Sequence, residues 1–229
     1  MISFLIIIVL SYLLGSIPTS VWVGKLFKGV DIREHGSGNP GATNTFRILG
    51  WKFGTAVSLI DVAKGFTAAY YISQLGYLTG GVPVIIGAWE TDVFMRLLAG
   101  SAAVCGHMYP LYARFKGGKG VITAAGMLYG IEPISISLAL IVFATVLFSS
   151  RYVSLGSILA TFSYPLFLLM LRYGFDQPVD GSLIVISAIV AAGIIIKHHS
   201  NIRRLLDGNE NRIRSFKPAR GRLNQEQQS

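Results

Sequence analysis

The chain has 229 residues, of which 52% are hydrophobic and 14% are charged, and its mean hydropathy is +0.56. Soluble domains carry about a quarter charged residues, so this composition predicts a membrane protein and excludes collagen-like, disordered and disulfide-rich classes. The net charge of +9 would suit a nucleic-acid ligand, but in so apolar a chain it indicates basic loops on one side of a membrane, with no nucleic acid as a partner.

Seven apolar segments are candidate membrane-spanning helices, which need about 20 residues each. They cover residues 2–23, 55–75, 94–111, 121–130, 133–148, 153–172 and 183–196. The first lacks the basic start and the cleavage site of a signal peptide, and we interpret it as an uncleaved span. The third and fourth are the weakest, so a fold with five spans and two re-entrant helices is the alternative.

The distribution of charge favours seven spans. Seventeen of the twenty Lys and Arg residues then fall in segments on one side of the membrane, and the opposite loops are mainly acidic. Because basic loops remain in the cytoplasm, the sequence predicts an all-α integral membrane protein of about seven transmembrane helices, with the N-terminus outside and the C-terminus cytoplasmic. Residues 1–213 would form one transmembrane domain, and residues 214–229 a basic, disordered tail.

Small and polar residues crowd the first cytoplasmic segment. Its glycines allow backbone N–H groups to converge on an anion; they are Gly36, Gly38 and Gly41. Its hydrogen-bonding side chains are Ser37, Asn39, Thr43, Asn44 and Arg47. An arginine fork suits phosphate or carboxylate. A flexible loop would explain the turn residues but not so many polar side chains, so the segment favours a binding site.

The second cytoplasmic cluster opens an apolar helix and consists of Lys116, Gly117, Gly118, Lys119 and Gly120. Glycines and lysines at a helix N-terminus can cradle a phosphate. The cluster is not a Walker A motif, because Ala113 and Gly120 occupy the places that require Gly and Ser or Thr. Lysines alone would indicate only a cytoplasmic flank, but three glycines exceed what topology requires.

The third cluster follows the last predicted span. On a continued helix His198, Asn201 and Leu205 share one face, with Arg204 near them. A basic flank that snorkels to the headgroups would explain the arginines but not the pairing of His198 with Asn201.

Two charges lie inside the second predicted span. Asp61 and Lys64 are three residues apart and would be costly in lipid if unpaired, so we expect them to pair with each other or with a neighbouring helix. We favour a structural ion pair over a proton relay. No metal site is expected, because the acidic residues are scattered and the adjacent His198 and His199 would point in different directions on a helix. No cofactor is expected either.

The three clusters together resemble the bacterial acyl-phosphate:glycerol-3-phosphate acyltransferases of the PlsY family. The matching stretches are GSGNPGATNTFRILG at 36–50, GHMYPLYARFKGGKGV at 106–121 and KHHSNIRRLLDGNENRI at 197–213. Tyr109 departs from the phenylalanine that is usual before the proline. The resemblance implies a seven-span enzyme of the bacterial plasma (inner) membrane with its active site facing the cytoplasm. It implies transfer of a fatty acyl group from acyl phosphate to the 1-position of glycerol 3-phosphate, giving lysophosphatidic acid and phosphate.

The resemblance also implies roles for individual residues. Ser37 and Arg47 match an essential serine and arginine of the family, and Lys119 matches a lysine of its phosphate-binding glycine loop. His198 and Asn201 match a pair near the acceptor, and all five residues are expected to be catalytic. Glu210 matches a structural glutamate. The remaining polar and glycine residues of the clusters are expected to bind phosphate or substrate; they are Gly36, Gly38, Asn39, Gly41, Thr43, Asn44, Lys116, Gly117, Gly118, Gly120 and Arg204.

Acyl phosphate is an activated anhydride, so the hypothesis requires no acyl-enzyme. The base is either His198 or a phosphate oxygen of the substrate, and we favour the substrate. The alternatives are an anion transporter for phosphate or glycerol phosphate, and a membrane scaffold; the scaffold gives no reason for the neutral polar residues. The three clusters can converge within one chain, so a monomer in the bilayer is expected.

Overall fold

The computed structural model describes residues 2–78 and 89–213, and within these ranges all regular structure is helical. The predicted tail and residues 79–88 of the outer loop lie outside the described residues. The long helices are α1 (Ile2–Gly15), α4 (Trp51–Tyr70), α6 (Thr91–Met108), α7 (Val121–Tyr129), α8 (Pro133–Ser150), α9 (Val153–Gly174) and α10 (Gly181–Lys197). The short ones are α2 (Thr19–Lys28), α3 (Ala42–Leu49), α5 (Leu75–Leu78) and α11 (His199–Leu206), with 3-10 turns η1 (Ile32–Glu34), η2 (Ile72–Gln74) and η3 (Leu111–Ala113).

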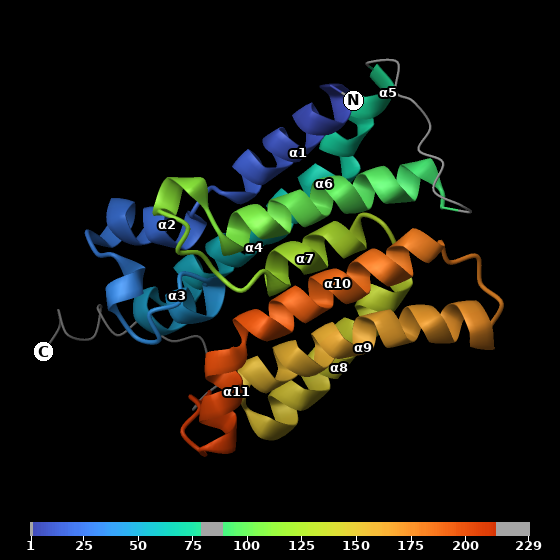
Figure 1. Cartoon of the computed structure of the whole chain (residues 1–229). Coiled ribbons are helices and arrows are strands. Elements are labelled where there is room, and N and C mark those ends of the chain that lie inside the picture. The colour runs from blue at the N-terminus through green and yellow to red at the C-terminus, as the bar shows by residue number, and fades with distance from the viewer. Residues whose placement is uncertain (1, 79–88, 214–229) are drawn as a thin grey trace, which may run out of the picture.

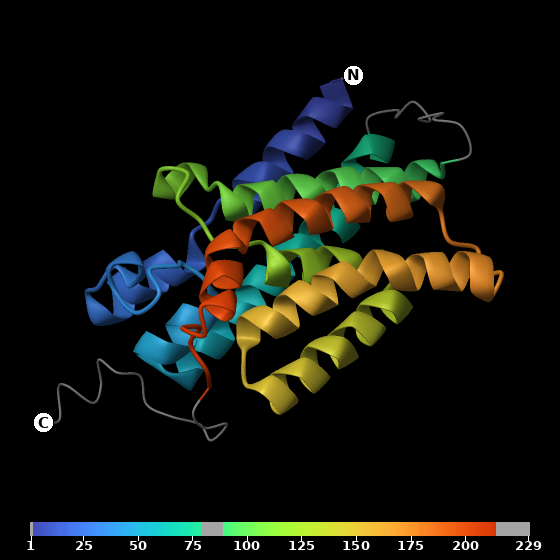
Figure 2. The same cartoon turned by 60° about the horizontal axis from the view of Figure 1, so that its bottom comes forward.

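All seven predicted apolar segments are mainly helical, and the long helices run side by side in alternating directions (Figures 1 and 2). Because of this alternation, the loops after α1, α6 and α10 reach the same end of the bundle. The N-terminus and the connection from α9 to α10 lie at the opposite end (Figure 1). The fold thus brings the three motif segments together at one face.

By length and composition, three helices of the described chain could cross a membrane, and a fourth could if the bent pair α10–α11 counts as one span. They are Phe4–Lys28, Pro133–Ser150 and Val153–Gly174. Large apolar side chains on these helices and on α10 are exposed, as lipid contact requires, among them Ile141, Phe162 and, on α10, Ile189. The count of seven spans and the orientation of the termini stay predictions.

Helix α7 is short, and it packs against α4, α6 and α8. Its nine residues extend about 14 Å, well under the ~30 Å hydrocarbon thickness. The carbonyl of Gly130, just after the helix, accepts a hydrogen bond of 3.0 Å from Nη1 of Arg96 on α6. A neighbouring helix therefore supplies a hydrogen-bond donor to the carbonyl at the end of α7.

The interior is built around α6, which packs against α1, α4, α7 and α10. Its Leu97 and Val104 are buried in the largest apolar cluster, which also contains Met127 and Leu168. Helices α4 and α7 approach so closely that a Cβ on Gly126 would lie 2.0 Å from the carbonyl oxygen of Val62. Such small-residue crossings are typical of membrane helices.

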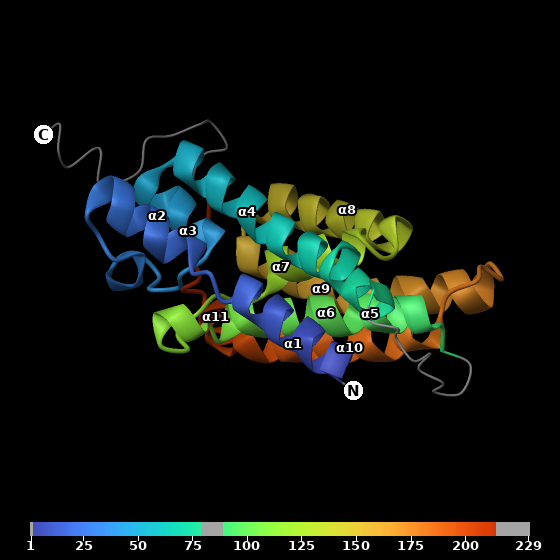
Figure 3. The same cartoon turned by 90° about the horizontal axis from the view of Figure 1, so that it is seen from above.

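The first predicted span is interrupted, which the sequence analysis did not anticipate. Helix α1 ends at Gly15 and α2 begins at Thr19. Pro18 lacks an N–H group and disfavours helical geometry at Ile17, so the helix breaks there. After the break, α2 packs against α3 and η1 at the motif end of the bundle, as Figure 3 shows for α2 and α3.

Candidate active site

The three motif segments surround one cavity of about 700 Å³, a size suited to small-molecule ligands. Predicted residues that line it are Ser37, Gly38, Asn39, Lys116, Gly117, Lys119 and Arg204. Residues that the sequence analysis did not select also line it, including Asp31, Arg33, Arg114, Phe115, Lys197 and His199. The cavity is therefore a basic pocket built from segments as far apart in sequence as Asp31 and Arg204.

Asn44, which the sequence predicts to bind substrate, instead holds the first loop in shape. It is 1% exposed, and its Nδ2 donates to the carbonyls of Ile32 and His35 at 3.0 and 2.9 Å. Its Oδ1 accepts the backbone N–H of Ser37 at 3.0 Å. A Cβ on Gly36 would lie 2.4 Å from this same oxygen, so only glycine fits there. The side-chain amide of Asn44 is thus hydrogen-bonded to the loop backbone. The resulting loop conformation places Ser37 at the cavity.

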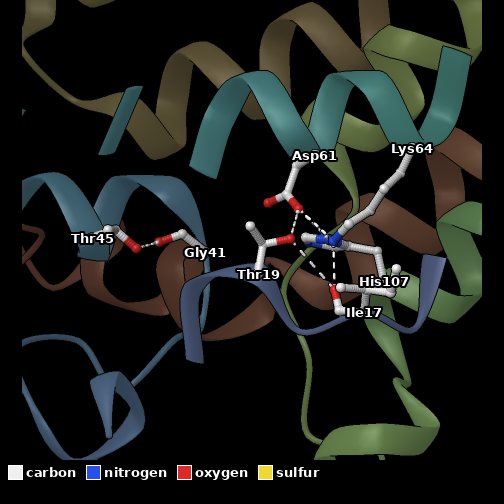
Figure 4. A network of polar contacts seen from close by, with 7 residues as sticks. All are labelled: Ile17, Thr19, Gly41, Thr45, Asp61, Lys64 and His107. Carbon is white, nitrogen blue, oxygen red and sulfur yellow. Dashed lines mark hydrogen bonds and ion pairs between the residues drawn. The ribbon is translucent and has the colours of Figure 1, made fainter. Parts of the chain in front are cut away.

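Helix α3 carries the rest of the first motif. Gly41 caps its N-terminus, Thr43 is half-buried in its first turn, and Thr45 Oγ1 donates to the Gly41 carbonyl at 3.1 Å (Figure 4). Arg47 lies in the last turn, and its Nη2 donates to the carbonyl of Asn211 at 3.4 Å. Arg47 therefore links the first motif to the end of the third.

The glycine loop of the second motif packs against the end of α6. The N–H of Gly118 donates to the carbonyl of His107 at 3.1 Å, and a Cβ at Gly118 would lie 2.1 Å from Nε2 of that histidine. Gly120 adopts a left-handed φ of 85° as it begins α7. Gly118 and Gly120 are buried, so they shape the loop, while Lys116, Gly117 and Lys119 line the cavity.

The helix expected to continue through the third motif is bent instead. Helices α10 and α11 meet at an angle of 57°, with His198 at the junction. The carbonyl of Ile194 lies 2.8 Å from Nδ1 of His198, and since a carbonyl can only accept, Nδ1 carries the proton and leaves a lone pair on Nε2. Burial lowers the pKa of His198 to about 4, which keeps the ring neutral near pH 7.

A chain of polar contacts joins the second motif to the third. Lys119 Nζ donates to Oδ1 of Asn201, and Nδ2 of Asn201 donates to Glu210 at 3.2 Å. Arg204 Nε donates to the same carboxylate at 2.8 Å. Burial, and next the nearby charge of Arg204, lower the pKa of Lys119 to about 8. Glu210 thus orients Asn201 and Arg204 toward the lysine.

Asp31 and Arg33 form a clasp that the sequence analysis missed. The guanidinium of Arg33 donates to Asp31 at 2.9 and 2.7 Å, and its Nη1 donates to the carbonyl of Ala113 at 3.2 Å. The clasp ties the first motif to the second across 80 residues of sequence. Arg33 holds the pKa of Asp31 well below its usual range. The one signal in the sequence is an acid and an arginine two residues apart just before the first motif.

The expected ion pair of α4 is confirmed. Lys64 Nζ lies 2.8 Å from Oδ1 of Asp61, and both side chains are 3% exposed. Figure 4 shows the pair together with Thr19, Ile17 and His107.

Taken together, the cavity carries six cationic side chains, Arg33, Arg114, Lys116, Lys119, Lys197 and Arg204. Asp31, one of the acids at its edge, is already neutralised by Arg33. The arrangement can hold phosphate groups by charge and by backbone N–H groups, at the end of an apolar bundle where a hydrocarbon chain would meet lipid.

Comparison with known proteins agrees with this chemistry. A family model described as glycerol-3-phosphate acyltransferase matches residues 5–208. The glycerol-3-phosphate acyltransferase of Salinibacter ruber is 47% identical, covering 96% of this chain and 97% of the relative. That of Chlorobaculum tepidum is 46% identical, covering 93% and 97%. The crystal structure of PlsY, an integral membrane glycerol 3-phosphate acyltransferase, in its glycerol 3-phosphate form is similar with a TM-score of 0.77 at 38% identity, covering 92% of this chain and 96% of that one. Its lysophosphatidic acid form is similar with a TM-score of 0.76, covering 92% and 95%.

Proposed function

Because this chain belongs to the glycerol-3-phosphate acyltransferase family, we propose that it transfers a fatty acyl group from acyl phosphate to the 1-hydroxyl of glycerol 3-phosphate. The products are lysophosphatidic acid and inorganic phosphate. The proposal agrees with the structural relatives, integral membrane enzymes in forms with glycerol 3-phosphate and with lysophosphatidic acid. The donor and the mechanism are our own inference.

The observation that supports this function best is the basic cavity itself. Both substrates carry a phosphate, so a site that brings them together must offset the repulsion of two anions. Lysines and arginines from three separate segments line about 700 Å³ of space, enough for two small head groups. The donor's acyl chain would extend along the apolar bundle into lipid.

In the proposed reaction the 1-hydroxyl oxygen attacks the acyl carbonyl carbon. The bond between that carbon and the bridging phosphate oxygen breaks, and inorganic phosphate leaves. Lys119 and Arg47 stabilise the charge that develops on the departing phosphate, and Ser37 and Asn201 orient the reacting oxygens. Alignment of two bound reactants can supply roughly 7–11 kcal/mol of the barrier. The anhydride is already activated, so no acyl-enzyme forms.

The hydroxyl proton passes to a phosphate oxygen of the substrate. His198 is the competing base, because its neutral ring keeps a lone pair on Nε2. However, its low pKa makes it a weak base, and it is only 3% exposed. Both features favour the substrate phosphate, and not His198, as the base.

His198→Gln tests this choice. We expect kcat to remain within about tenfold of wild type, because glutamine keeps a polar group at the position of the ring but cannot act as a base. Phosphate release at saturating substrates measures kcat, and a thermal melt checks the fold of the variant. A folded variant with almost no turnover would identify His198 as the base.

The basic face is proposed to lie in the cytoplasm of a bacterial cell, with the enzyme in the plasma (inner) membrane and the N-terminus outside. The support is the concentration of Lys and Arg in the motif segments. The enzyme is proposed to act as a monomer, because one chain supplies all three segments of the cavity.

Product identification tests the proposed function. The purified protein in lipid nanodiscs, given palmitoyl phosphate and glycerol 3-phosphate, should form lysophosphatidic acid acylated at the 1-position, as read by mass spectrometry. Formation of the 2-acyl isomer would overturn the assigned position, and no lysophosphatidic acid at all would overturn the function.

A further inference from the structure

One oxygen of a buried carboxylate joins three segments beneath the cavity. Oδ1 of Asp61 accepts hydrogen bonds from Thr19 Oγ1 at 2.9 Å and from Lys64 Nζ at 2.8 Å. Nδ1 of His107 lies 3.8 Å from the same oxygen. These side chains come from α2, α4 and α6 and point toward one another (Figure 4). Lys64 also donates to the carbonyl of Ile17 at the break before α2, and this carbonyl accepts the backbone N–H of Thr19 as well.

From this oxygen, one line of contacts leads to the glycine loop. His107 holds the loop directly, since its carbonyl accepts the N–H of Gly118 and its ring occupies the space of the missing side chain. A void of about 10 Å³, too small for a substrate, separates Asp61 and His107 from Lys116 and Gly117. The network therefore forms the floor on which the second phosphate loop rests.

A second line of contacts leads to the first loop. Thr19 is the first residue of α2, and α2 packs against both η1 and α3. Val21 shares a buried cluster with Ile32, which precedes the first motif, and with Ile48, which lies near its end. A shift of Thr19 would thus move the segment that displays Ser37 at the cavity.

We propose that Asp61 is a positioning residue, which fixes both phosphate-binding loops by acting through Thr19 and His107. The inference rests on the proposed function, because it concerns the geometry of that same site. An ion pair that only stabilises the fold can be replaced by apolar side chains of similar volume with little loss, and often with a gain. A positioning carboxylate cannot be replaced in this way, because an apolar side chain cannot accept a hydrogen bond from the Thr19 hydroxyl or interact with the His107 imidazole.

The paired variant Asp61→Leu with Lys64→Met separates the two roles. We expect its melting temperature to stay within about 4 °C of wild type. We expect its kcat/KM to fall about 100-fold, with the KM of both substrates raised, because loops displaced by about 1 Å misalign the phosphates. The stabilisation of the protein by saturating glycerol 3-phosphate, measured as a shift in melting temperature, should be lost as well. A paired variant with wild-type kcat/KM and the full ligand-induced shift would overturn the proposal.

Thr19→Val provides a second test should the paired variant fail to fold. The substitution preserves shape and removes only the hydroxyl that meets Asp61, so we expect a folded protein with kcat/KM lowered about tenfold. Unchanged kcat/KM and an unchanged ligand-induced shift in this variant would contradict the proposal.

The matched control lies at the other end of α6, where Arg96 pairs with Asp92 at 2.7 Å. Asp92→Asn with Arg96→Met removes this ion pair, and with it the hydrogen bond from Arg96 to Gly130, without touching either loop, so both KM values should stay at the wild-type level. Loss of ligand affinity there too would show that any weakened fold has this effect, and would defeat the proposal. A wild-type protein that binds glycerol 3-phosphate but releases no phosphate would defeat the proposed function instead, and the ligand-induced shifts would still decide the role of Asp61.

Discussion

Replacing Lys119 with methionine should lower kcat/KM for glycerol 3-phosphate about a thousandfold. Lys119 lines the cavity at the start of α7 and is held by Asn201, so its ammonium is aimed before substrate arrives. Loss of one preorganised donor to a developing anion typically lowers the rate about 10²–10³-fold, and here a full charge is lost with it. The measurement is phosphate release from palmitoyl phosphate at varied glycerol 3-phosphate.

Lys52→Met is the matched control, because Lys52 is an exposed lysine at the start of α4, outside the cavity. It carries the same change of net charge and should leave kcat/KM within about twofold of wild type. An equal loss in both variants would mean that the overall charge of the face, and not Lys119, supports the reaction.

The pKa of Lys119 predicts how the activity of the enzyme depends on pH. This pKa is lowered to about 8, and only the protonated form neutralises phosphate. The kcat/KM of the free enzyme should therefore fall as pH rises through about 8. In Lys119→Arg the guanidinium stays protonated, so the descending limb should move up by at least about one pH unit. Identical descending limbs in both proteins would show that another group titrates.

Arg47→Met should produce the second largest loss, about 100-fold or more in kcat/KM. Arg47 is half-buried in the last turn of α3, and its positive charge contributes to the lowered pKa of Lys119. We therefore expect the two cations to act on one phosphate. Arg47→Lys keeps the charge but loses the planar fork, so we expect an intermediate loss of about tenfold.

Arg203→Met is the control for Arg47, since the Arg203 side chain on α11 is 87% exposed. Separate KM values for the two substrates would also indicate which phosphate Arg47 contacts. Equal activity of Arg47→Met and Arg203→Met would remove Arg47 from the site.

The sequence was sufficient to predict the helices, because long apolar segments have few other stable conformations in lipid. It did not predict where two of them bend. Pro18 breaks the first span, and the bend at His198 separates α10 from α11. Both breaks lie within apolar or basic runs, and the average composition of each run predicts one continuous helix.

The site was predictable in outline because its residue types are unusual for a membrane protein. The role of each residue within the site was not predictable. Asn44 resembles a ligand-binding residue in sequence, but it satisfies three backbone groups of its own loop. Arg33 appeared to be one more basic flanking residue, but it reaches a carbonyl 80 residues away. Such roles depend on which groups the fold brings within hydrogen-bond distance, and no local pattern reports that.

The most direct test of the account is the identity of the acyl donor. The purified protein in lipid is given palmitoyl phosphate with and without glycerol 3-phosphate, and palmitoyl-CoA with glycerol 3-phosphate in parallel. We expect phosphate release that depends on glycerol 3-phosphate, and no reaction of the CoA ester. Turnover with palmitoyl-CoA but none with palmitoyl phosphate would contradict the account.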